Sequence, residues 1–454
     1  MATADSSVIL SAPIVPTLRK MTIPMIFGMI FLMLFNLVDT FFISMLGTEP
    51  LAAISFTFPV TFTVISLAIG LGIGTSAVIA TALGAQSTNQ ARFDGGVALV
   101  ISAVMVLALS AVGYLFTEEI FLLLGAKAHL IEIIEQYMHI WFLASVLLVT
   151  PMIGNAVLRA NGDTKTPSIV MGCSGLVNAI LDPILIFGFG PIDAMGVQGA
   201  AIASAISWIL GVAAILYILT RQRNLVTLRC PSQSFAVATR KILKIGLPAA
   251  GANMLTPIAM AVMTAIVANF GAPAVAAFGV GSRIESIASL VVLALSMTLP
   301  PFISQNFGAG KHERVRSAYQ QTLKFVMVWQ FAIYLLLLMV APFIAAAFAD
   351  EQQVSDLIQL FIYVLPLSYG LQGVIILTNS SFNAIHKPMN ALILSIVRLF
   401  VFYVPIAYLG SLLADLTGLF VGAALGNLFT AVIAYYWFSR GLQCTEVKTQ
   451  ELTP

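Results

Sequence analysis

Two aspartates lie inside long apolar segments of the chain, where burying a charged carboxylate costs free energy. Asp39 lies within "FNLVDTFFISMLG" (35–47) and Asp182 within "NAILDPILIFG" (178–188). An ionisable residue at membrane depth is a functional candidate by default, because hydrocarbon does not solvate its charge. The chemistry open to these two acids is the binding and release of a proton or a small cation.

The spacing of the two acids indicates a common depth. Asp39 lies eight residues before Gly47 and Asp182 eight before Gly190, and each glycine marks the end of an apolar run. At 1.5 Å per helical residue, both carboxylates lie about 12 Å from the same face of a membrane. The alternative is that each aspartate bonds a neighbouring helix and only fixes its packing.

Neighbouring polar groups strengthen the site hypothesis. Asn178 precedes Asp182 by four residues and Asn36 precedes Asp39 by three, so each amide shares a helix face with its acid. Pro183 lacks the N–H that would bond the carbonyl of Ala179, which leaves one more free acceptor. These oxygens suit a proton or, alternatively, Na⁺ at Asp39, Asn178 and Asp182.

Three further charges lie within apolar segments in the second half: Arg283, Glu285 and Arg398. Arg283 and Glu285 are two residues apart, so they point to different helix faces and pair poorly with each other. Arg398 is the candidate partner of Glu285. A buried structural ion pair and a role in gating both remain open.

The composition identifies an integral membrane protein. Hydrophobic residues make up 59% of the 454 residues and charged residues 9%, against about 25% charged in soluble domains. The histidines have no metal-ligand spacing, and no zinc-protease, serine-hydrolase or nucleotide-binding motif occurs. The sequence therefore predicts no enzyme, no cofactor and no nucleic-acid partner. "GLGIGTS" (70–76) lies inside an apolar segment, where small residues predict close helix packing.

About twelve membrane-spanning helices are expected. Their ranges are 21–46, 51–81, 97–116, 130–157, 167–189, 196–220, 242–269, 275–306, 321–348, 355–382, 389–411 and 416–438. Of the basic residues between these segments, nearly all fall on one side, with Lys127 as the exception. By the positive-inside rule, that side and both termini are cytoplasmic.

The second half of the chain repeats the first at an offset of 224 residues. Lys20 matches Lys244 and Pro24 matches Pro248, and the register continues through Arg92 and Arg316. Six spans per repeat give both halves the same orientation, which is a transporter architecture with a parallel repeat. We expect an N-lobe over 1–220, a linker over 221–241, a C-lobe over 242–440 and a cytoplasmic tail over 441–454. The fold class is an all-α membrane protein of two six-helix lobes.

The repeat is not symmetric in its charges. Asp39 matches Met263, and Asp182 matches a position near Tyr403 or Val404. Ion coupling is therefore expected in the first lobe.

The motifs together resemble one transporter family over nearly the whole chain. "KMTIPMIFGMIFLMLFNLVDTFFISMLG", "NAVLRANGDTKTP", "NAILDPILIFG" and "GVGSRIESI" are similar to the multidrug and toxic compound extrusion (MATE) transporters. Within that family the paired acids resemble the DinF branch. The NorM branch has an acid on its seventh helix, and 242–269 contains none.

The resemblance implies roles for particular residues. Asp39 becomes the principal coupling carboxylate and Asp182 its partner, with Asn178 and Tyr137 in one hydrogen-bonded network. Asn155 lines the N-lobe cavity, and Pro24 allows the first helix to bend. The network threonine of the family has no match near "GAAIASA" (199–205), where Ser204 is the candidate substitute.

The function implied is proton-coupled antiport of cationic and amphipathic drugs across the bacterial inner membrane, by alternating access in a monomer. Sodium-coupled or dual-ion antiport is one alternative, and a lipid-linked oligosaccharide flippase is another. A membrane-embedded enzyme or a passive channel is a third, although no catalytic constellation supports it.

Overall fold

The computed structural model describes residues 8–229, 234–349 and 351–451. The side chains of Asn36 and of 443–451 lie outside this description, as do the ends of the predicted tail. The chain divides into two compact units, Met1–Ala250 and Gly251–Pro454. The division falls inside the seventh span, so the predicted linker 221–241 and the first turns of that span belong to unit 1.

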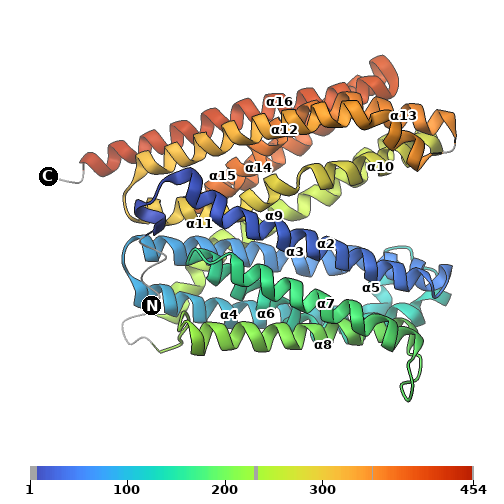
Figure 1. Ribbon diagram of the computed structural model, residues 1–454, viewed down its shortest axis with the longest axis horizontal. Coiled ribbons are helices and arrows are strands. Elements are labelled where there is room, and N and C mark those ends of the chain that lie inside the picture. The colour runs from blue at the N-terminus through green and yellow to red at the C-terminus, as the bar shows by residue number, and fades with distance from the viewer. Residues whose placement is uncertain (1–7, 230–233, 350, 452–454) are drawn as a thin grey trace. The chain divides into compact units, whose positions relative to one another are not determined.

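Unit 1 is built from long apolar helices, labelled in Figure 1. They are α2 (Ile14–Ser44), α3 (Thr48–Gly84), α4 (Thr88–Leu115), α5 (Thr117–Leu123), α6 (Ala128–Ala160), α7 (Lys165–Phe187), α8 (Gly196–Tyr217), the π-helical turn η1 (Ile218–Gln222) and the start of α9 (Phe235–Ala268).

Unit 2 contains the rest of α9 and a second set of helices. They are α10 (Ala272–Ala288), α11 (Leu290–Gly308), α12 (His312–Phe348), α13 (Gln352–Val364), the 3₁₀ turn η2 (Leu365–Ser368), α14 (Tyr369–Ala384), α15 (Pro388–Ile396), the π-helix η3 (Val397–Tyr403) and α16 (Val404–Glu451).

Among the described residues, eleven helical segments are long and apolar enough to cross a membrane. The last of these, Pro388–Leu442, has 55 residues, which at 1.5 Å each is far more than one bilayer core requires. Its backbone leaves the helical region at Ala414 and Asp415, where Asp415 has φ 49°. The segment therefore contains the last two of the twelve predicted spans. The predicted eighth span, 275–306, is interrupted at Ser289 between α10 and α11.

Glycines let α9 pack tightly against α3 within unit 1. A Cβ added at Gly70 would lie 2.4 Å from the carbonyl oxygen of Gly246, and one at Gly74 2.6 Å from that of Ile242. Any side chain at these two positions would push the helix backbones apart. The packing role predicted for "GLGIGTS" is confirmed.

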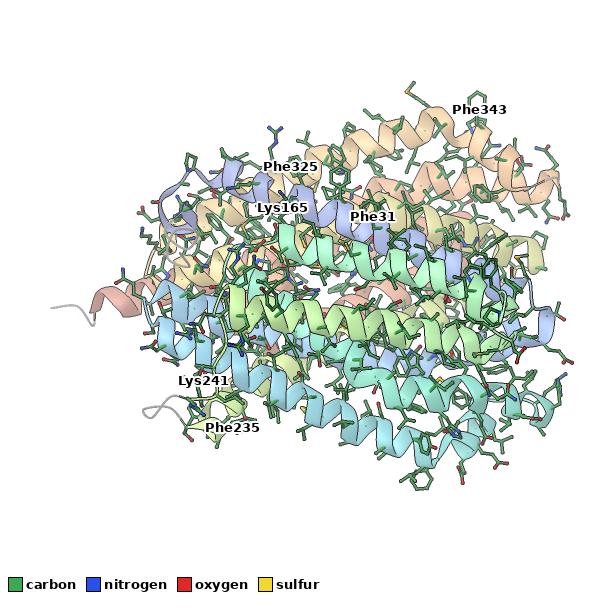
Figure 2. The ribbon with its side chains drawn as sticks, turned by 60° about the horizontal axis from the view of Figure 1, so that its bottom comes forward. Phe31, Lys165, Phe235, Lys241, Phe325 and Phe343 are labelled. Atoms are coloured by element: carbon green, nitrogen blue, oxygen red, sulfur yellow. The ribbon has the colours of Figure 1, made fainter. Side chains whose placement is uncertain are left out.

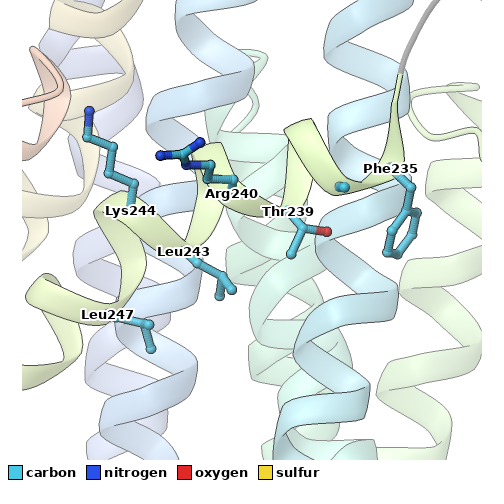
Figure 3. Close-up of a pocket in the computed structure, with 7 residues that line it drawn as sticks. Phe235, Thr239, Arg240, Leu243, Lys244 and Leu247 are labelled. Carbon is cyan, nitrogen blue, oxygen red and sulfur yellow. The ribbon is translucent and has the colours of Figure 1, made fainter.

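The first turns of α9 carry an apolar stripe beside a basic one. Phe235, Thr239, Leu243 and Leu247 recur every four residues, and they border a shallow hollow of about 500 Å³ together with Ala236, Arg240 and Lys244. Figure 3 shows the two basic side chains reaching away from the leucines. Such a helix start suits a membrane–water boundary, with its charged ends in water and its apolar side in lipid.

Large apolar side chains also project outward along the spans. Phe31 of α2 and Phe325 and Phe343 of α12 are exposed within the chain and are labelled in Figure 2. An exterior of this kind is stable against lipid tails, in agreement with the composition.

Candidate functional site

The centre of the site in unit 1 is Asp182, which is fully buried on α7. Its Oδ1 accepts a hydrogen bond from Asn178 Nδ2 at 3.1 Å, because a spacing of four residues puts both on one helix face. The same Nδ2 donates to Ser204 Oγ on α8 at 3.4 Å. Asp182 Oδ2 is buried and receives no hydrogen bond from the described residues.

Asp39 approaches this cluster from α2. Helices α2 and α7 pack closely, since a Cβ on Gly28 would lie 3.0 Å from Ser168 Oγ and one on Gly175 would overlap the Phe35 ring. Asp39 lies close enough to Asp182 for electrostatic repulsion between the carboxylates. Its Oδ1 is also buried and lacks a hydrogen-bond partner among the described residues.

Tyr137 of α6 is the third member that the structure brings to the acids. It interacts electrostatically with both Asp39 and Asp182. Two carboxylates, a phenol, an amide and a hydroxyl thus meet from helices that are far apart in the sequence. This arrangement can hold a proton or a small cation, because each acid keeps one buried oxygen free.

Two predicted residues, Asn155 and Pro24, lie apart from this cluster, and the side chain of a third lies outside the described residues. Asn155 is buried on α6, but it is eighteen residues beyond Tyr137, or about 27 Å along the helix. Pro24 lies inside α2, which continues through it without a break. The side chain of Asn36 is outside the described part of the structure. The predicted cavity and bending roles of Asn155 and Pro24 stay predictions.

Helices α6 and α8 also border a polar hollow of about 370 Å³. Its lining residues are Glu132, Glu135, Gln136, His139, Ile140 and Gln198. The same two helices carry Tyr137 and Ser204, so polar surface and acid cluster share a scaffold. Within the described ranges, no three His, Cys, Asp or Glu side chains are grouped to hold a metal ion.

In unit 2 the position that matches Asp39 is apolar. Met263 is completely buried, within a core that includes Phe278, Phe361 and Tyr403. An acid there would lose its solvation without gaining a partner. Among the described residues, the paired acids Asp39 and Asp182 both belong to unit 1, and the matching position in unit 2 is Met263.

The predicted pairing of Glu285 with Arg398 is wrong in its geometry. Glu285 Oε1 instead accepts a hydrogen bond from Gln372 Nε2 of α14 at 2.8 Å. Arg398 attracts Glu285 electrostatically, but the two form no ion pair within 4.0 Å. Its guanidinium lies 5.9 Å from the centre of the Tyr403 ring. Arg283 is exposed on α10.

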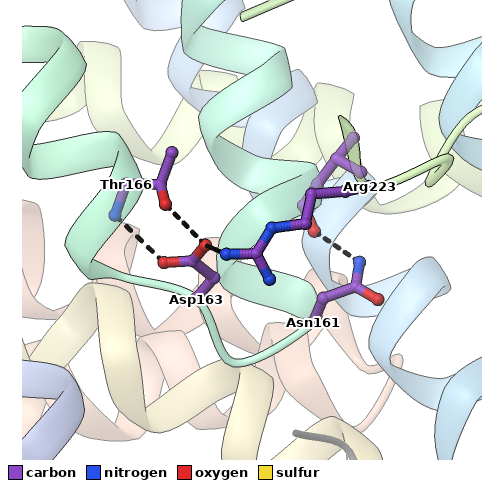
Figure 4. A network of polar contacts seen from close by, with 5 residues as sticks. Asn161, Asp163, Thr166 and Arg223 are labelled. Atoms are coloured by element: carbon purple, nitrogen blue, oxygen red, sulfur yellow. Dashed lines mark hydrogen bonds and ion pairs between the residues drawn. The ribbon is translucent and has the colours of Figure 1, made fainter. Parts of the chain in front are cut away.

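Sequence reasoning missed a polar network in unit 1, where the turn before α7 meets the end of η1. Asp163 accepts from Thr166 N at 3.0 Å and Thr166 Oγ1 at 2.6 Å, and it forms an ion pair with Arg223 at 3.2 Å (Figure 4). The pair joins the turn before α7 to the end of η1. Asp163 and Arg223 are 60 residues apart, so no helical spacing in the sequence indicates that they pair. The only hint was the polar turn "NGDTKTP" itself.

The comparisons with known proteins agree with this architecture. The MatE family profile matches residues 24–184 and again 248–409. The two matches begin 224 residues apart, which confirms the internal repeat. An FAD transporter of Shewanella oneidensis is 40% identical over 96% of this chain and 97% of its own. The multidrug export protein MepA of Staphylococcus aureus is 25% identical over 93% and 94%.

Solved structures give the same result. The Vibrio cholerae MATE transporter VcmN in its bent form superposes with a TM-score of 0.92 and 34% identity, over 98% of this chain and 99% of that one. A MATE transporter in the straight conformation superposes with a TM-score of 0.90 and 27% identity, over 97% and 98%. The repeat, the twelve-span fold and both comparisons agree, and the chain belongs to the MatE family of membrane transporters.

Proposed function

We propose that this protein is a secondary transporter that exports FAD or a closely related flavin nucleotide, coupled to protons through Asp39 and Asp182. The choice of FAD as the substrate is supported by the 40% identity to the FAD transporter over almost the full length of both chains. Two relatives with multidrug names, YoeA of Bacillus subtilis and MepA of Staphylococcus aureus, are 24% and 25% identical to this chain. Shared transport of a large planar, phosphate-bearing molecule is the simplest reason for that difference.

The coupling step rests on the acid cluster of unit 1. Two neighbouring carboxylates, Asp182 buried and Asp39 half-buried, resist simultaneous ionisation, so one proton bound between them relieves their repulsion. They then titrate as a pair rather than as two separate acids. Protonation from the outside and release to the cytoplasm would alternate with substrate movement. Na⁺ remains the alternative ion, since the same oxygens can bind it.

Export of amphipathic cations is the second candidate. It is supported by the relatives MepA of Staphylococcus aureus and YoeA of Bacillus subtilis, which are named as multidrug proteins. The acids of unit 1 also offer a cation an attractive environment when they are ionised. The same liposome assay can measure transport of both substrate classes, so FAD and a cationic dye are tested side by side.

The test uses purified protein in liposomes loaded with FAD or with a cationic dye. A pH gradient and a sodium gradient are imposed separately, and release is followed by fluorescence. We expect FAD release to follow the pH gradient and to fall at least roughly tenfold in Asp39→Asn.

The control is Asp193→Asn, because Asp193 is exposed in the loop between α7 and α8. It removes the same charge outside the cluster and should transport normally. Dye release without FAD release would favour the second candidate. Release driven by sodium alone, or unchanged in Asp39→Asn, would reject the proposed proton coupling.

A further inference from the structure

Unit 2 contains a cluster of polar side chains, two of them buried and three half-buried, that the proposed proton coupling does not use. Glu285 comes from α10, Tyr369 and Gln372 from α14, and Arg398 and Tyr403 from η3. Tyr369 is 2% exposed and Tyr403 7%. Ionisable groups at this depth are rare and mark ligand or ion sites more often than packing.

The π-helix gives the cluster its shape. The i→i+5 hydrogen bonds of η3 widen the turn, so residues five apart lie on one face. Arg398 therefore lies over the ring of Tyr403, 5.9 Å from its centre. An uninterrupted α-helix would separate these two side chains around its axis. Segments of π-helix occur frequently at functional sites.

The guanidinium of Arg398 has hydrogen-bonding capacity that the protein leaves unused. Its Nε is buried without a partner among the described residues. The nearest acid, Glu285, is held by Gln372 and forms no ion pair with it within 4.0 Å. The hydroxyl of Tyr369 is also buried without a hydrogen-bond partner there. The Nε–H of Arg398 and the hydroxyl of Tyr369 can therefore both donate to a ligand, and the positive charge of Arg398 favours an anion.

Arginine is the side chain best suited to phosphate, because its planar fork of N–H groups donates two parallel hydrogen bonds. We propose that Arg398, with the hydroxyl groups of Tyr369 and Tyr403, forms a phosphate-binding site in unit 2 that takes the diphosphate of the transported flavin nucleotide. This inference rests on the proposed FAD transport and names the residues that recognise its anionic part.

Glu285 has the opposite effect in this site. Its charge offsets that of Arg398 and weakens the attraction for a phosphate. The acid thereby limits affinity, which lets the anion leave after transport. Removing the charge of Arg398 should therefore weaken FAD binding, and removing the charge of Glu285 should strengthen it. A cluster that only stabilised the fold would not give opposite effects on binding.

The experiment measures binding of FAD, FMN and riboflavin to the full chain in nanodiscs by flavin fluorescence. FMN is riboflavin with one added phosphate, so the ratio of the riboflavin Kd to the FMN Kd isolates the phosphate contribution, and FAD adds the second phosphate together with adenosine. Arg398→Gln should weaken FAD binding roughly 10- to 100-fold and leave riboflavin nearly unchanged. Arg398→Lys should retain part of the preference. Glu285→Gln should tighten FAD binding.

Arg440→Gln is the matched control, because Arg440 is an exposed arginine of unit 2 on α16. Retained riboflavin binding shows that each variant is folded. If the wild-type protein binds FAD and Arg398→Gln keeps the full preference for FAD over riboflavin, the phosphate site is rejected while FAD transport stands. If the wild-type protein binds none of the three flavins, the proposed function itself fails.

Discussion

At Asp39 and Asp182, one carboxylate oxygen of each acid is buried without a hydrogen-bond donor among the described residues. A pair kept permanently ionised in this way would be costly, since each free oxygen has lost its water. The cost falls when a proton or a cation occupies the site. The residues themselves thus favour a site that changes its charge over one that only fixes packing.

The first residue-scale prediction concerns the coupling of the two acids. Asp39→Asn and Asp182→Asn should each lower proton-driven transport, and the double variant should be no slower than the worse single one. The reason is that residues acting as one unit show strongly non-additive effects. Transport rates of the four proteins in liposomes, at equal protein incorporation, check this. Losses that multiply would mean that the acids work independently.

Sequence spacing was sufficient for part of this site. The Asn178–Asp182 hydrogen bond follows from a separation of four residues on one helix. Ser204 was a candidate only through the family resemblance, and the structure places its hydroxyl 3.4 Å from Asn178. The contacts of Gln372 with Glu285, 87 residues apart, carry no local signal. Contacts between helices depend on rotation and tilt, which periodicity does not encode.

At the scale of elements, small residues decide how closely helices approach. The segment Gly70–Gly74 of α3 touches the backbone of α9 around Gly246. The sequence predicted this use of glycine but not the partner helix. Likewise, the sequence did not predict the break of the eighth span at Ser289 or the π-helix at Arg398, although Pro405 follows that π-helix and removes a backbone donor.

A matched pair of glycine variants tests the packing. Gly70→Ala places a methyl group 2.4 Å from the Gly246 carbonyl oxygen, so the helices must separate. Gly72→Ala, on the same helix, meets Ala156 Cβ at 3.7 Å and Ile153 Cδ1 at 4.0 Å, which are ordinary contacts. Gly70→Ala should cost about 1–3 kcal/mol and lower Tm by several degrees, whereas Gly72→Ala should not.

Thermal unfolding of the detergent-purified variants gives the measurement. Equal Tm values for Gly70→Ala and the unchanged protein would show that α3 and α9 are not in close contact. A comparable loss in Gly72→Ala would point to helix propensity or solubility as the cause, in place of the contact.

For the whole molecule, the charge pattern predicts which side faces the cytoplasm. Asp193 lies in the α7–α8 loop and Arg221 in η1, at opposite ends of α8. In a variant with Cys173, Cys230 and Cys444 replaced by serine, Asp193→Cys should react with an impermeant maleimide on intact cells. Arg221→Cys should react only after permeabilisation, because basic segments stay inside.

Both exposed positions are polar in the native chain, so neither cysteine should disturb the fold. The serine-substituted parent, without any added cysteine, measures background labelling. The reverse pattern would invert the whole topology and place the acids near the cytoplasmic face.

The sequence by itself determined the membrane class, the helical spans, the repeat and the two acids. These depend on local composition and on residue order, which persist along the chain whatever its packing. The tertiary structure alone decided three things: how Tyr137 and Ser204 are placed beside the acids, that Glu285 bonds Gln372 and forms no ion pair with Arg398 within 4.0 Å, and that unit 1 extends into α9. Each depends on the mutual rotation of helices, which is set by the fit of side chains across many contacts at once.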